Sequence, residues 1–176
     1  MDLPNPDKMF DILMERITIL KALTSTCVRK VNSSPTSLTS THPKTCLKLN
    51  GEWLQLIRED SKNLFTYFSS ALYFTEGKSK KVKFLLTNFV TSNQEGISKI
   101  FKDLGMEEGD LEIYVSNIMN DHSDFEITLV FLCALYNLQA EIYFKRSEVT
   151  TEIPKDMEVY ISPTGEEDMV KFTLSL

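Results

Sequence analysis

The stretch that decides the fold is EDSKNLFTYFSSAL, residues 59–72. A polar turn, Glu59 to Lys62, leads directly into apolar residues at helical spacing. A thiol at the position of Asn63 would lie at a helix N-terminus, where the helix dipole stabilises a thiolate. Because an asparagine side chain is not a nucleophile of this kind, the stretch has the layout of a nucleophile site without its reacting group.

Apolar spacing predicts further elements on the C-terminal side of this turn. Residues 46–57 are interpreted as a short helix or an extended piece that turns at Asn50 and Gly51. The expected helices cover residues 63–75, 81–93, 98–104, 109–120 and 125–138. The expected strands cover residues 139–146, 157–163 and 169–176, and the last of them is expected to pair with the strand before it. Because helices come first and strands last, the order predicts an α+β fold with helices packed on a small antiparallel sheet.

The N-terminal region predicts an amphipathic helix that extends from Lys8 to about Lys30. Phe10, Leu13, Ile17 and Leu20 recur at spacings of three and four, so they project from one face. Such a broad apolar face must be buried, either on the helix's own domain or on a partner. These four residues are therefore candidates for partner binding, and self-packing is the alternative.

The stretch after this helix is rich in serine and threonine and contains two prolines, a composition typical of a mobile linker. We therefore expect three parts: an N-terminal helix over residues 1–30, a linker over 31–45 and a compact domain over 46–176.

Composition excludes several classes of function. The net charge of −6 argues against direct nucleic-acid binding, which needs a basic surface. The basic cluster KSKKVK, residues 78–83, is interpreted as a solvated loop that leads into a helix. No run of about 18 apolar residues is present, so we expect neither a transmembrane segment nor a signal peptide.

The cysteines and histidines do not form a metal-ligand pattern. Cys27, Cys46 and Cys133 are far apart, and His42 and His122 are the two histidines of the chain. We therefore expect no metal and no cofactor, with reduced thiols in an intracellular protein, cytoplasmic or nuclear. Cys133 is expected in the core and His122 in a surface loop.

The order of these parts resembles the ovarian tumour (OTU) family of cysteine deubiquitinases, in particular the branch of the fly ovarian tumour protein. The resemblance covers about residues 47–172. The family's nucleophile motif, Asp-Gly-x-Cys-Leu-Phe-Arg, falls on residues 60–66, where Asp60, Leu64 and Phe65 match and Asn63 replaces the cysteine. A second motif, Glu-Leu-x-Ala-Leu-Ser-x-x-Tyr, falls on residues 128–136 without its glutamate.

The family's last motif, His-Tyr-Asp-Ser-Val, falls on residues 166–170, where Asp168 and Val170 match and Glu166 replaces the histidine. The resemblance implies a papain-type fold with a degenerate cleft of Asp60, Asn63, Glu166 and Asp168, in which Glu166 faces Asn63. Hydrolysis of this kind needs a thiolate and a histidine base, and the chain has neither at these positions.

The resemblance therefore implies a pseudo-deubiquitinase that acts as a protein-interaction or scaffold module in a larger complex. Ubiquitin is a candidate partner, because one alternative is a domain that binds ubiquitin without cleaving it. A further alternative is a hydrolase with a relocated nucleophile.

Overall fold

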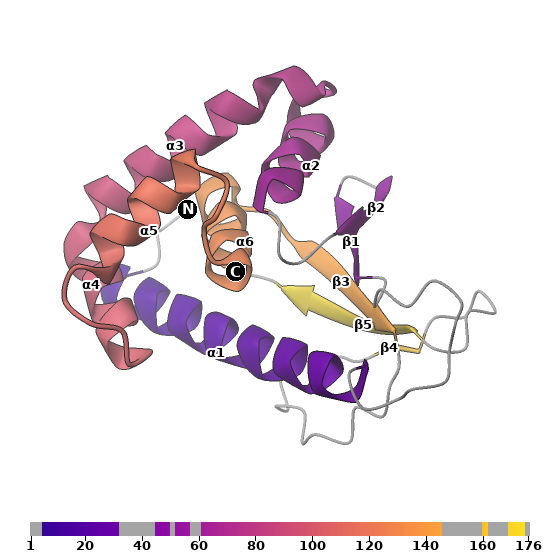
Figure 1. Ribbon diagram of the computed structural model, residues 1–176, viewed down its shortest axis with the longest axis horizontal. Coiled ribbons are helices and arrows are strands. Elements are labelled where there is room, and N and C mark those ends of the chain that lie inside the picture. The colour runs from indigo at the N-terminus through magenta and orange to yellow at the C-terminus, as the bar shows by residue number, and fades with distance from the viewer. Residues whose placement is uncertain are drawn as a thin grey trace.

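The computed structural model describes residues 5–31, 45–49, 52–56, 61–145, 160–161 and 169–174. Most of these residues are helical, and the strands lie at one end of the molecule (Figure 1). The helices are α1 (Pro6–Val31), α2 (Ser61–Tyr73), the short 3-10 helix η1 (Glu76–Lys78), α3 (Ser79–Ser92), α4 (Gln94–Asp103), α5 (Asp110–Met119) and α6 (Phe125–Tyr136). The strands are β1 (Thr45–Leu49), β2 (Glu52–Leu56), β3 (Ala140–Lys145), β4 (Tyr160–Ile161) and β5 (Met169–Leu174).

The strands pair into one antiparallel sheet in the order β2-β1-β3-β5-β4. The register aligns one residue of each strand in a single row: Gln55, Cys46, Tyr143, Lys171 and Tyr160. Residues 46–49 and 52–56, for which a helix was one interpretation, lie in the paired strands β1 and β2, and the predicted turn at residues 50–51 lies outside the described residues. The last strand pairs with the strand before it, as the sequence predicts. The narrower papain-type assignment remains a proposal.

Helix α6 is the centre of the core. Eight of its residues, from Phe125 to Cys133, are buried. Contacts join α6 to α1 on one side and to α2 and α3 on the other (Figure 1). A helix this apolar must be surrounded, and α1, α2, α3 and the Tyr114 ring of α5 (Asp110–Met119) pack around it.

Helix α1 packs on its own domain, in contacts with α4 and α6. Leu13, Ile17 and Leu20 are fully buried in the same core cluster as α6. Of the two alternatives left open by the sequence, partner binding and packing on the helix's own domain, the structure shows the second for these three residues, because side chains that already lie in the core offer no free surface. Phe10, which is partly buried, packs against the edge of this cluster.

The start of α4 differs from the prediction. The helix begins at Gln94, four residues before the predicted start at Ser98, and Gly96 lies inside it. Glycine normally disfavours a helix interior. Here Phe10 of α1 lies where a side chain at residue 96 would project, so the close approach of two helices explains the glycine. As predicted, the helix ends before Gly105. This glycine has a left-handed φ of 79°.

The predicted linker lies almost wholly outside the described residues, since residues 32–44 are not among them.

Candidate functional site

The first turn of α2 contains the position at which the family resemblance would have a cysteine nucleophile. Asn63 is the third residue of this helix. Leu64, Phe65 and Phe68, which follow it, are fully buried, as expected for a central core helix. The side chain of Asn63 lies outside the described part of the structure, and so do Asp60, Glu166 and Asp168 entirely. The predicted facing of Asn63 and Glu166 therefore stays a prediction.

The sheet register nevertheless relates the strand that precedes Asn63 in the chain to the strand that follows Glu166. Gln55 of β2 and Lys171 of β5 lie in the same row of the sheet. The next residue, Leu56, ends β2, and Met169, two residues before Lys171, begins β5. Strand β2 therefore ends at the same end of the sheet at which β5 begins. Three strand spacings separate them, about 14 Å at ~4.8 Å each.

Cys133 is a core residue, as the sequence predicts. Its side chain is 1% exposed, and burial raises the pKa of its thiol from 9.0 to about 12. A thiol reacts as the thiolate, so a buried group of this kind is a poor nucleophile at neutral pH. Cys133 therefore has the properties of a core residue and not those of a nucleophile.

The loop between α5 and α6 contains the sequence DHSD, residues 121–124, whose side chains are of the types used in serine hydrolases. Ser123 is buried and accepts a hydrogen bond from the Thr128 hydroxyl, 3.0 Å away. His122 is exposed, as predicted for a surface loop. Asp121 forms an ion pair with Lys83 of α3, at 2.5 Å. Ser123 and Asp121 therefore have different neighbours, which favours a structural role for the loop.

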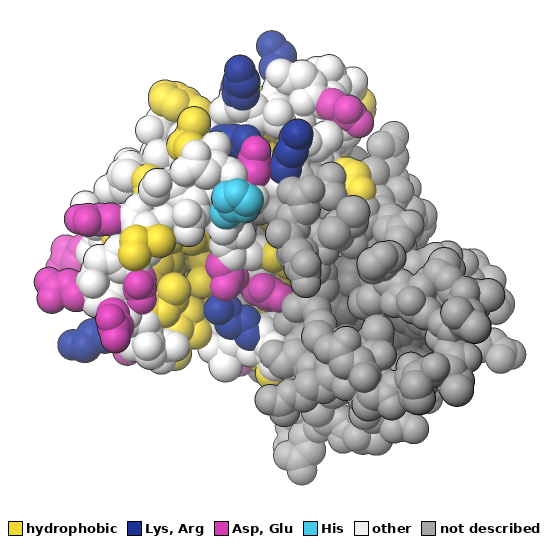
Figure 2. Space-filling model, in the orientation of Figure 1, with side chains coloured by type: hydrophobic (Ala, Val, Ile, Leu, Met, Phe, Trp, Pro, Cys, Tyr) yellow, Lys and Arg dark blue, Asp and Glu magenta, His cyan; other side chains and the backbone are white. Residues whose placement is uncertain are grey.

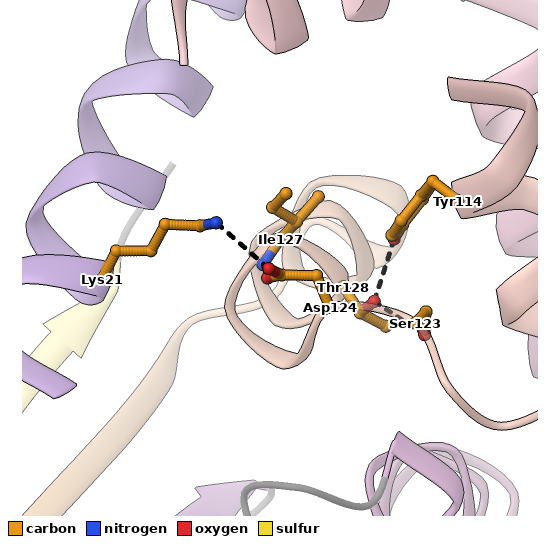
Figure 3. Close-up of polar contacts among 6 residues, drawn as sticks. All are labelled: Lys21, Tyr114, Ser123, Asp124, Ile127 and Thr128. Carbon is orange, nitrogen blue, oxygen red and sulfur yellow. Dashed lines mark hydrogen bonds and ion pairs between the residues drawn. The ribbon is translucent and has the colours of Figure 1, made fainter. Parts of the chain in front are cut away.

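Two polar contacts hold the start of α6 (Figure 3). Asp124 is its N-cap and accepts a hydrogen bond from the Ile127 N–H at 3.0 Å, while its other carboxylate oxygen lies 3.1 Å from the Lys21 ammonium of α1. A pair of hydroxyl groups lies deeper: Tyr114 of α5 and Thr128 are 2.9 Å apart. Burial is the main cause that raises the pKa of Tyr114.

Sequence reasoning did not single out this polar cluster. A partial signal was available, since Ser123 and Asp124 precede a long apolar run and aspartate is a preferred N-cap. The partners Lys21 and Tyr114 come from other helices, so no local pattern identifies them.

A shallow depression of about 350 Å³ lies on the outer face of α1, lined by Asp11, Met14, Glu15, Thr18 and Ile19. It is open and carries no thiol or imidazole, so its lining favours no reaction. Among the described residues there is no group of three or more side chains that could hold a metal ion. No helix within the described ranges is long and apolar enough to cross a membrane.

Comparison of the chain with models of known protein families, with curated proteins and with solved structures finds no match.

Proposed function

We propose that this chain is a catalytically inactive OTU-like domain that acts as a protein-interaction module. The observation that carries the proposal is the sheet register. Strand β2 precedes Asn63 in the chain, and strand β5 follows Glu166. The last residue of β2 and the first residue of β5 lie at the same end of the sheet. A papain-type cleft needs the segments that carry Asn63 and Glu166 near each other. The placement of the two strand ends is compatible with such a cleft.

The chemistry of the two positions supports inactivity. Asn63 has no ionisable nucleophile, and Glu166 is a carboxylate where the family uses an imidazole. Loss of either member of such a catalytic unit costs several orders of magnitude in rate. The burial and raised pKa of the Cys133 thiol argue against the alternative in which this cysteine is a relocated nucleophile.

A second candidate function is ubiquitin binding without cleavage. Only the family resemblance supports it. A pull-down with ubiquitin chains separates it from a module that binds other proteins.

The proposal is tested by restoring the missing groups. The double variant Asn63→Cys with Glu166→His should react with a ubiquitin probe that carries a thiol-directed electrophile at its C-terminus. The reaction requires the new thiol and imidazole to lie within hydrogen-bond reach, about 2.6–3.2 Å. The wild-type chain should neither react with the probe nor cleave any ubiquitin linkage.

The matched control is Lys62→Cys with Glu166→His, which moves the thiol by one residue, to an exposed position. Adduct on the first double variant but not on the control supports an OTU-like cleft. Equal labelling of both, or labelling of neither when both melt like the wild type, contradicts it. Probe reaction of the wild type at Cys27, Cys46 or Cys133 would instead favour a relocated nucleophile.

A further inference from the structure

The corner between α2 and α3 exposes two large aromatic side chains. Phe74, directly after α2, is 88% exposed, and Phe84 on α3 is 61% exposed. They are two of four large hydrophobic side chains that are exposed in the described part of the chain. Isolated exposed apolar residues are ordinary on protein surfaces, but these two have basic and aromatic neighbours.

Hydrogen bonds hold the backbone of this corner. The buried Ser69 hydroxyl donates to the Thr75 carbonyl and accepts from the Lys78 N–H at 3.0 Å. Thr75 caps η1 by accepting from the Gly77 N–H at 3.2 Å. Phe74 has a left-handed φ of 56°, a conformation that glycine adopts most easily at the end of a helix. The exposed Phe74 ring therefore projects from a turn whose backbone is fixed by hydrogen bonds.

The corner is basic although the chain is acidic. Residues 61–92 contain five lysines and one acidic residue, Glu76, whereas the whole chain has a net charge of −6. Lys78, Lys80 and Lys81 are exposed. Figure 2 shows Lys and Arg side chains over the α2–α3 end and many Asp and Glu side chains over α4 and α5.

Two of the exposed lysines, Lys80 and Lys81, lie near aromatic side chains. Lys80 and Lys81 precede Phe84 by four and three residues, so the three side chains share one face of α3. The Lys81 ammonium also lies 4.7 Å from the centre of the Tyr73 ring, next in sequence to Phe74. Lys83 differs from them, because it is largely buried and its charge is paired with Asp121.

We propose that this α2–α3 corner, composed of Phe74, Lys78, Lys80, Lys81 and Phe84, binds an acidic segment of a protein partner. The segment carries an aliphatic or aromatic side chain next to its carboxylates. Exposed ammonium groups attract the carboxylates and steer the encounter, and the two phenylalanines bury the apolar side chain.

Charge decides between this occupant and a nucleic acid. Nucleic-acid binding gains its free energy from many phosphate contacts, and the corner offers three exposed lysines on a chain of net charge −6. A short acidic segment needs only a few ion pairs and is repelled less by the remaining surface. The inference depends on this surface and not on the family resemblance, so it stands or falls separately from the proposed inactive cleft.

The test is selection from a displayed library of random 12-residue peptides on the immobilised full chain. Selected peptides should be enriched in Asp and Glu beside Leu, Ile, Phe or Trp. Their affinity, measured by fluorescence anisotropy, should fall as salt rises from 50 to 200 mM, because the exposed ion pairs are screened. The charge reversal Lys80→Glu with Lys81→Glu should weaken binding by about tenfold or more, and Phe84→Ser by about fivefold or more.

The matched control is Lys99→Glu with Lys102→Glu, the same change at two exposed positions on α4. Its affinity for the peptides should stay within about twofold of the wild type, since its charges lie outside the corner. All variants alter exposed side chains, and their melting temperatures should match the wild type.

Three results would overturn the proposal. One is a set of selected peptides without acidic enrichment, or with affinity that the charge reversal leaves unchanged. Another is tighter binding of a 20-nucleotide oligo(dT) than of every selected peptide, which would assign the corner to nucleic acid. The third is concentration-dependent self-association that the same charge reversal abolishes, which would assign it to a second copy of this chain.

Discussion

The ring of Phe10 in α1 lies directly over Gly96 in α4, in the space that a Cβ atom at residue 96 would occupy. Glycine at this position therefore lets the two helices approach closely. With Leu13, Ile17 and Leu20 buried below it, this contact makes α1 part of the folded core.

Replacing Gly96 should destabilise the protein. In an ordinary exposed helix, Gly→Ala stabilises by roughly 0.5–1 kcal/mol. In Gly96→Ala the new methyl group overlaps the Phe10 ring, and overpacking costs about 1–3 kcal/mol, which should lower the melting temperature by several degrees. Thermal unfolding followed by circular dichroism measures the change.

The control for this pair is Gly96→Ala in a Phe10→Ala background. There the methyl group has room, so the second change should become neutral or stabilising. If Gly96→Ala raises the melting temperature of the wild type, Phe10 does not occupy this space.

Truncation of Leu13 should be costly. Leu13→Ala leaves a cavity among fully buried side chains, and such a change costs about 2–5 kcal/mol. Thr18→Ala, at an exposed position of the same helix, is the control and should change the stability by no more than about 0.5 kcal/mol. Denaturant titration measures both. Equal stability of the two variants would return α1 to the role of a free docking helix.

Asp124 should contribute mainly as a helix cap. Asp124→Ala removes the acceptor for the Ile127 N–H, which costs about 0.5–2 kcal/mol. Asp124→Asn keeps an acceptor and loses the ion pair with Lys21, which is partly exposed to solvent and therefore worth only ~0–1 kcal/mol. The free energy of unfolding in urea should therefore be highest for the wild type, lower for Asp124→Asn and lowest for Asp124→Ala. An asparagine variant as unstable as the alanine variant would show that the charge dominates.

Cys133 should make stability decrease at alkaline pH. Its folded pKa, raised to about 12, exceeds that of the unfolded thiol, so above pH ~9 the unfolded state loses a proton that the folded state keeps. The free energy of unfolding should then fall by up to about 1.4 kcal/mol per pH unit from this group. Cys133→Val should remove this part of the slope between pH 8.5 and 10 (roughly the range around the free thiol's pKa). An unchanged slope would mean that the thiol ionises in the folded protein.

Local patterns in the sequence predicted most of the helices. The apolar spacing of residues 64–72 and 125–133 identified α2 and α6 to within about two residues, because each buries a continuous face. The same reasoning correctly placed Cys133 in the core and the last two strands beside each other. It also located Asn63 in the first turn of a buried helix.

Only the tertiary structure decided the contacts between elements. Periodicity showed that Leu13, Ile17 and Leu20 must be buried, but it could not distinguish their own domain from a partner, since both remove the same apolar surface from water. Periodicity also placed the start of α4 after Gly96, whereas the helix begins at Gln94. The contact that accommodates this glycine comes from Phe10, 86 positions earlier in the chain, so local sequence patterns do not contain it. The pairing of Lys83 with Asp121, which separates that lysine from its exposed neighbours Lys80 and Lys81, likewise depends on how α3 packs against the loop after α5.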